Sequence, residues 1–231
     1  MFGGNTFMPF RTLGPGPPEV GMINNKSYID PPSPPISQHL DENYICNSTH
    51  MSKTCRKSEK CVCTHIEYLP LNKVVEFVYY NPDNPNSTLN HPMHHHGVSF
   101  QVRGMGTFPD NFVVNECNVR KFHESGMMCS KQKKYPLMDT VPLFAHGYLV
   151  YRIYTSNPVG LSLEEPRFMN RSFIPNWNLH GYWLIHCHID MHMAAGMKFV
   201  VHVGTKEDLP PVPKDFPKCG RYLPPIQLCQ D

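Results

Sequence analysis

Two histidine-rich blocks far apart in the chain constrain its fold most strongly. The first block reads His91-Pro-Met-His94-His95-His96-Gly97, and the second opens with His186-Cys187-His188 and ends at Met197. In an extended strand, side chains two residues apart point to one face and the residue between them points to the other. If both blocks are extended and lie side by side, their two His-x-His pairs meet on one face.

The two pairs predict a metal site with more than one ion. His94 and His96 share a face in the first block, and His186 and His188 share a face in the second. Cys187 then points to the opposite face, toward a different site. A single buried histidine is more often a hydrogen-bonded core residue than a ligand, but six candidate ligand histidines and one cysteine in two such blocks favour metal binding.

The second site can be completed from the same blocks. A thiolate, two imidazoles and a weak thioether form the ligand set of blue-copper sites. Cys187 supplies the thiolate, and Met197 supplies the thioether. The two imidazoles come from His192 and from His91. The sequence therefore predicts a mononuclear copper site on the far side of the strand from the histidine pairs.

Composition favours an all-β domain with long loops. The chain has 231 residues and 24 prolines, and only 17% of its residues are charged against about 25% in typical globular proteins. This excludes a coiled coil, a long-helix bundle and a charge-rich disordered chain. Short β-branched and aromatic segments separated by turn residues predict a sandwich or barrel. The expected strands are residues 74–80, 98–105, 140–141, 147–154, 181–188 and 197–203.

The chain divides into three parts by composition. Residues 1–40 are rich in Gly, Pro and Asn and are expected to be linker and loop. Residues 41–204 contain all the predicted strands and copper ligands, beginning with a disulfide-stapled loop at 41–66 and including a long surface excursion at 117–139. Residues 205–231 form a proline-rich tail.

Nine cysteines are present, and removing Cys187 as a ligand leaves an even number. We expect four disulfides among the remaining eight, which requires an oxidising compartment. Cys219 and Cys229 are the one pair assigned, on proximity alone. Zinc binding by Cys55, Cys61, Cys63 and His65 is the alternative, which their spacing disfavours. The eight cysteines are Cys46, Cys55, Cys61, Cys63, Cys117, Cys129, Cys219 and Cys229.

Other features bear on location and partners. Four Asn-x-Ser/Thr sequons begin at Asn25, Asn47, Asn86 and Asn170, and with the cysteines they favour a secreted glycoprotein. The first 20 residues lack a signal peptide, so we expect the chain to begin inside a longer protein. No apolar run is long enough to span a membrane. The net charge of +2 and a single lysine cluster at residues 131–134 give no reason to expect nucleic acid as a partner.

Both histidine blocks resemble the signature motifs of multicopper oxidases. Residues 91–97 match the pattern H-P-x-H-x-H-G, and residues 181–197 match G-Y-W-x-x-H-C-H-x-x-x-H-x-x-x-x-M. The likeness covers roughly residues 22–204. Residues 24–38 and 61–65 are similar to the third, C-terminal cupredoxin domain of invertebrate laccases. The resemblance implies a Greek-key β-sandwich of cupredoxin type.

The resemblance also implies a role for each ligand. His91, Cys187 and His192 would bind the type 1 copper with Met197 as axial ligand. His94 would bind the type 2 copper, while the type 3 pair would take His96, His186 and His188. Phenols or diphenols would donate single electrons to the type 1 copper. The electrons would pass through Cys187 and its flanking residues His186 and His188 to the cluster, where dioxygen is reduced to water.

The chain departs from the family pattern in several ways. His95 takes the place of an apolar residue, and by alternation it points away from the cluster, so we interpret it as packing or supporting the site. His180 is interpreted as a loop residue. The histidines given no metal role are His39, His50, His65, His123, His146 and His202.

The largest departure is that the two His-x-His pairs supply only half of the family's cluster histidines. The N-terminal cupredoxin domain of the same parent protein would be the partner that supplies the rest. A stand-alone blue-copper electron carrier is one alternative, although it would not need these pairs. A ferroxidase is another, although no iron-binding carboxylates are identified.

Overall fold

The computed structural model describes both histidine blocks and most of their surroundings. The described residues are 6–13, 20–38, 40, 42–51, 55, 61–132, 134–155, 181–209, 211–212 and 214–216. Their strands are β1 (Thr6–Leu13), β2 (Val20–Ile23), β3 (Lys26–Tyr28), β4 (Ile45–Cys46), β5 (Cys61–Leu69), β6 (Val74–Tyr80), β7 (His91–His95), β8 (Phe100–Thr107), β9 (Leu137–Met138), β10 (Thr140–Leu143), β11 (Gly147–Tyr154), β12 (Gly181–Cys187) and β13 (Lys198–Val203). The helical elements are α1 (Glu116–Glu124), α2 (Asp190–Ala194) and the 3-10 turn η3 (Lys206–Asp208).

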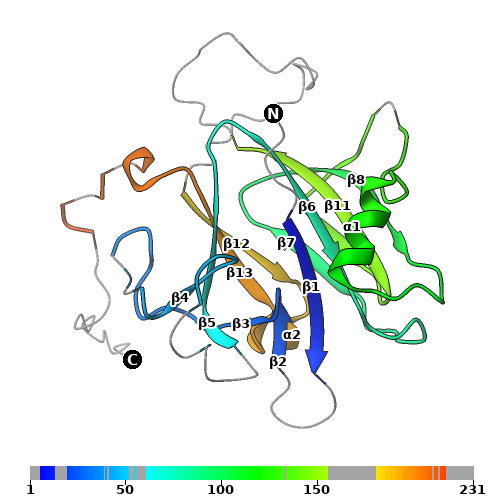
Figure 1. Cartoon of the computed structure of the whole chain (residues 1–231). Coiled ribbons are helices and arrows are strands. Elements are labelled where there is room, and N and C mark those ends of the chain that lie inside the picture. Colours follow the sequence, from blue (N-terminus) through cyan, green and yellow to red (C-terminus); the bar gives the residue numbers. More distant parts are fainter. Residues whose placement is uncertain are drawn as a thin grey trace, which may run out of the picture.

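The strands form two layers. One layer has the order β10-β7-β12-β13-β5, and the other has the order β1-β6-β11-β8-β9. Figure 1 shows β6, β8 and β11 in one layer and β5, β12 and β13 in the other. The short strands β2 and β3 connect the layers by pairing with β1 and β5, respectively. The predicted all-β sandwich is confirmed.

The main hydrophobic core lies between the layers. Its largest fully buried side chains are aromatic and include Phe77, Phe100, Tyr151 and Phe199. Phe100 stacks on Tyr151 with ring centroids 4.1 Å apart. Cys187 and Met197 belong to the same cluster, so one edge of the copper site predicted from the sequence is built into the core.

Most predicted strands are found where they were expected. The bounds of 74–80 and 147–154 are reproduced, and the strands at 98–105, 140–141, 181–188 and 197–203 are shifted or resized at their ends. The surface excursion at 117–139 also contains the helix α1. Its first turn is capped by Asn115, whose side chain accepts a hydrogen bond from the Asn118 amide.

Residues 1–40 were expected to be linker and loop, and this is wrong for Thr6–Leu13, which forms β1, and for residues 20–28. Val20–Ile23 and Lys26–Tyr28 form a tight hairpin with Asn24 and Asn25 at positive φ. Most of the hairpin side chains are buried: Ile23 belongs to the main core, and Tyr28 packs with Leu40, Ile66 and Val200. The stapled loop at 41–66 likewise ends early, because β5 begins at Cys61.

The disulfide expectation is confirmed in part. Disulfides join Cys46 to Cys63 and Cys55 to Cys61, which disfavours zinc at these residues. Cys117 and Cys129 are free thiols, so the expectation that both are oxidised is wrong; Cys117 lies exposed on α1, and Cys129 hydrogen-bonds to His123. The expected Cys219–Cys229 pair lies outside the described residues.

The environment of His123 predicts that the stability of the folded chain depends on pH. Hydrogen bonds to Cys129 and to Glu76 raise the pKa of His123 from 6.5 to about 9. The folded state therefore holds this proton more tightly than the unfolded state. The resulting stability is fully present below pH 6.5 and is lost as the pH rises through about 9. The temperature of half-unfolding should therefore decrease as the pH is raised from 6.5 to about 9. In His123→Gln this decrease should be smaller. A variant with the same pH dependence as the wild type would contradict the prediction.

Candidate metal centre

The sheet brings the two histidine blocks together. β7 pairs with β12 in antiparallel register, which places His94 opposite His186 and Met93 opposite Cys187. Buried and partly exposed side chains alternate along β7. His91, Met93 and His95 therefore face inward, while His94 faces the other side. This division of faces is the one that the sequence predicted.

His91, Cys187 and His192 form a buried group. Cys187 Sγ lies 3.7 Å from His91 Nδ1 and 3.6 Å from His192 Nδ1, and the two Nδ1 atoms are 3.2 Å apart. Metal–nitrogen and metal–sulfur bonds of about 2.0–2.3 Å in a trigonal site place neighbouring donors roughly 3.4–3.7 Å apart. The two sulfur–nitrogen distances fit one metal ion bound by a thiolate and two imidazoles, and the nitrogen–nitrogen distance is slightly shorter than this range.

Burial sets the proton occupancy of this group. Desolvation, reinforced by His192, lowers the pKa of His91 from 6.5 to about 4. The imidazole is therefore neutral near pH 7, which is its metal-binding form. Desolvation raises the pKa of the Cys187 thiol from 9.0 to about 11. Binding a metal as thiolate would require Cys187 to release that proton, which the charge of a bound cation favours.

Met197 lies beside this group. It is fully buried, its amide donates to the His192 carbonyl at 2.9 Å, and its carbonyl accepts from the Cys187 amide at 3.0 Å. The loop through α2 therefore joins three of the predicted ligands by backbone hydrogen bonds.

The β2–β3 hairpin holds this loop from outside. The Gly21 amide and the Ser27 hydroxyl both donate to the Ala195 carbonyl, at 2.9 and 3.1 Å, and the Tyr28 amide donates to the Gly196 carbonyl. Gly196 has φ +102°, and a Cβ there would lie 2.1 Å from Ser27 Oγ. Sequence reasoning missed this support because it treated the hairpin as linker. The tight Asn24-Asn25 turn was the signal that could have found it.

Gly196→Ala is expected to disturb the metal group. The new methyl would strain the backbone and push Ser27 away, so the Met197 loop must shift. In copper-loaded protein, the visible charge-transfer band should shift or weaken. Gly126→Ala is the matched control, because Gly126 also has positive φ (+82°) but a Cβ there meets nothing within 4 Å. Equal spectra for the two variants would contradict the inference that the contact of Gly196 with the hairpin positions the Met197 loop.

A second group gathers on the other face of the strands. Donor atoms of His94, His96 and His186 lie within 4.8 Å of one another, and His96 Nε2 is 3.0 Å from His186 Nε2. The His188 ring lies 5.5 Å from that of His186 and 5.7 Å from that of His94. His96 and His188 are exposed and His94 is half-buried, so this group opens to the surface.

Hydrogen bonds orient the rings of this group. His94 Nδ1 lies 2.9 Å from the Asp139 carbonyl oxygen and 2.8 Å from Thr140 Oγ1. His186 Nδ1 lies 3.0 Å from the Cys187 carbonyl oxygen. An Nδ1–H donating to a carbonyl leaves Nε2 as the lone-pair donor toward a metal. The arrangement therefore suits metal binding through Nε2 atoms.

His95 points away from this group, as alternation predicted. It is buried, and its Nδ1 lies 3.2 Å from the Tyr151 hydroxyl, which lies 3.0 Å from the Tyr79 hydroxyl. Burial, with smaller contributions from His94 and His96, lowers the pKa of His95 to about 3. His95 thus anchors the middle of the first block to the core.

The remaining histidines have other partners or lie apart from the two groups. His65 and His123 pair with Glu67 and Glu76, respectively, at 2.8 and 2.9 Å. Of the described residues, the potential metal-binding groups are the two histidine groups and the four disulfide-bonded cysteines. His39 and His180 lie outside the described residues.

Comparisons with known proteins agree with this geometry. The family model for multicopper oxidases matches residues 30–160 and 173–207. Laccase-7 of Oryza sativa subsp. japonica is 33% identical over 167 residues, which cover 68% of this chain and 22% of that protein. An L-ascorbate oxidase of Brassica rapa subsp. pekinensis is 26% identical, with 89% of this chain and 30% of that protein covered.

The fold agrees as well. The structure of a laccase from Botrytis aclada superposes with a TM-score of 0.51 at 17% identity, covering 90% of this chain and 30% of that one. The chain thus spans less than a third of the length of these relatives. The sandwich is of the cupredoxin type. By the match of its sequence, the chain belongs to the multicopper oxidase family.

Proposed function

We propose that the chain is the C-terminal, third cupredoxin domain of a laccase-like enzyme of invertebrate type. The whole protein would oxidise phenols or diphenols by single electrons and reduce dioxygen to water. His91, Cys187 and His192, with axial Met197, would hold the type 1 copper. His94 would hold the type 2 copper, and the type 3 pair would take His96, His186 and His188. Bound copper would supply the one-electron redox chemistry at both groups.

The observation that carries this proposal is the direct connection between the two groups. Cys187 belongs to the buried group, while its sequence neighbours His186 and His188 belong to the open group. The His186 Nδ1–H can donate to the Cys187 carbonyl, which adds a hydrogen bond of 3.0 Å to the covalent path. An isolated electron carrier has no use for such a connection.

The open group also supports a partner domain. Exposed imidazoles of His96 and His188 leave room for further ligands from outside this chain. We propose that an N-terminal cupredoxin domain of the same protein supplies them. The two disulfides and the sequons support an extracellular, glycosylated protein. Within the described part of the chain, no helix has the length and apolar character to cross a membrane.

The test is an oxygen-uptake assay of the full-length parent protein with a diphenol and with ferrous iron. Uptake with the diphenol, at four electrons per dioxygen, is expected. Turnover of ferrous iron alone would contradict the laccase assignment and favour a ferroxidase. Absence of turnover with either reductant would contradict an oxidase altogether.

A further inference from the structure

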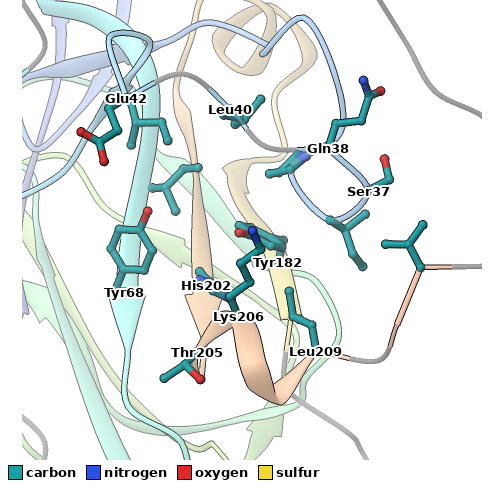
Figure 2. Close-up of a pocket in the computed structure, with 16 residues that line it drawn as sticks. Ser37, Gln38, Leu40, Glu42, Tyr68, Tyr182, His202, Thr205, Lys206 and Leu209 are labelled. Carbon is teal, nitrogen blue, oxygen red and sulfur yellow. The ribbon is translucent and has the colours of Figure 1, made fainter.

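A cavity of about 610 Å³ lies on the outer side of the sheet that carries the metal groups. Its floor is a row of three rings on neighbouring strands. Tyr182 on β12 lies opposite His202 on β13, and His202 lies opposite Tyr68 on β5. Figure 2 shows Tyr68 on one side of His202 and Tyr182 on the other, with Ser37, Gln38 and Leu40 above them and Thr205 and Leu209 below.

The cavity is separate from both metal groups. Tyr182 precedes Cys187 on β12 by about 16 Å at roughly 3.3 Å per residue. On β13, the neighbours of His202, Val201 and Val203, point into the core between the layers, so His202 points outward. A molecule in this cavity would therefore not contact the predicted ligands.

His202 is the unusual feature of the cavity. It is 4% exposed, and neither of its buried ring nitrogens has a hydrogen-bond partner in the part of the chain that the structure describes. Leaving such a group unpaired costs about 1–3 kcal/mol. Its ring stacks on Tyr182 with centroids 4.2 Å apart and meets Tyr68 edge-on at 5.5 Å. These contacts fix the ring but do not satisfy the nitrogens.

The protonation state of His202 indicates what could satisfy it. Burial lowers its pKa, so the ring is uncharged near neutral pH. A neutral imidazole has one N–H donor and one lone-pair acceptor. A hydroxyl group can pair with either nitrogen, whereas an ether oxygen can only accept.

The rest of the lining selects an uncharged, largely apolar molecule. Leu40, Ile45, Ile66 and Leu209 line it with the two tyrosine rings, and the charged residues Glu42 and Lys206 have opposite signs. The volume lies in the range of small-molecule sites, roughly 300–1,000 Å³. Because the ring nitrogens of His202 are shielded, side chains that line the cavity would have to move aside before a ligand hydroxyl could reach them.

We propose that this cavity binds a phenol, with the ligand hydroxyl paired to His202 and its ring packed among the tyrosine and aliphatic side chains. This site is additional to any oxidation site at the copper group. If the proposed function holds, the protein would bind phenols at a second site, where they are not oxidised.

The test uses the copper-free full chain, so that oxidation plays no part and failure of the proposed oxidase function would not affect it. Phenol and anisole, which lacks the hydroxyl proton, are titrated separately and followed by calorimetry and by NMR shifts of the cavity residues. Phenol should bind at least tenfold more tightly than anisole, with shifts at Tyr68 and Tyr182.

His202→Phe keeps a ring on Tyr182 but removes both nitrogens. It should fold with an unfolding midpoint no lower than that of the wild type, weaken phenol binding at least tenfold and abolish the preference over anisole. His50→Phe, at an exposed histidine outside the cavity, should leave binding unchanged. Equal binding of both probes, no binding of phenol, or unchanged phenol affinity in His202→Phe would overturn the proposal.

Discussion

Replacing Cys187 with serine should abolish the intense visible absorption of the copper-loaded chain and weaken copper binding at the buried group. The thiolate is the charge-transfer partner and the one soft donor among the three. Removing even an outer-shell partner of a metal ligand costs about 10–100-fold in affinity. Removing this ligand should cost at least as much. Visible spectra and copper analysis after dialysis measure both effects.

Cys129→Ser provides the control. Cys129 is also an unpaired cysteine, but it lies beside His123 and away from both histidine groups. Its variant should keep the colour and the copper. If Cys187→Ser remained intensely coloured, the proposed ligand set would be wrong.

The chain taken alone should fail to reduce dioxygen catalytically. Its buried group is complete in the described residues, but the open group has exposed histidines that face no further ligand of this chain in its described part. A strong reductant should therefore transfer an electron to the buried copper, while the open group binds copper weakly and loses it to a chelator. Catalytic oxygen uptake by the chain alone should be below the detection limit under conditions in which the full-length protein turns over.

Oxygen uptake with a diphenol, recorded for monomer isolated by size exclusion, measures this. Sustained four-electron reduction by the monomer would contradict the need for a partner domain. The same activity confined to an oligomer would mean that another copy supplies the missing ligands.

Sequence alone predicted the strands from β-branched and aromatic segments between turn residues, and it predicted from alternation how the side chains of the two histidine blocks divide between two faces. A period of two assigns every second side chain to one face, and this holds for His94 and His95 whatever surrounds them. Helix α1 was missed because its apolar residues are few. Asn115 followed by Glu116 was the capping signal that could have revealed it.

Contacts between distant segments were beyond the reach of sequence patterns. The bond from Ser27 to the Ala195 carbonyl depends on how the hairpin meets the α2 loop, and the stacking of Tyr182 on His202 depends on the pairing register of β12 and β13. Likewise, His123 gains its raised pKa only when the fold places Glu76 and Cys129 beside it. Local periodicity contains no information about such partners.

The most direct test of the metal assignment is the position of copper itself. An anomalous-scattering map from crystals of the copper-loaded chain should show one strong peak enclosed by Cys187 Sγ and the Nδ1 atoms of His91 and His192, with Met197 alongside. Any copper at His94, His96 and His186 should be weaker. A dominant peak elsewhere, or no peak between these three donors, would contradict the account.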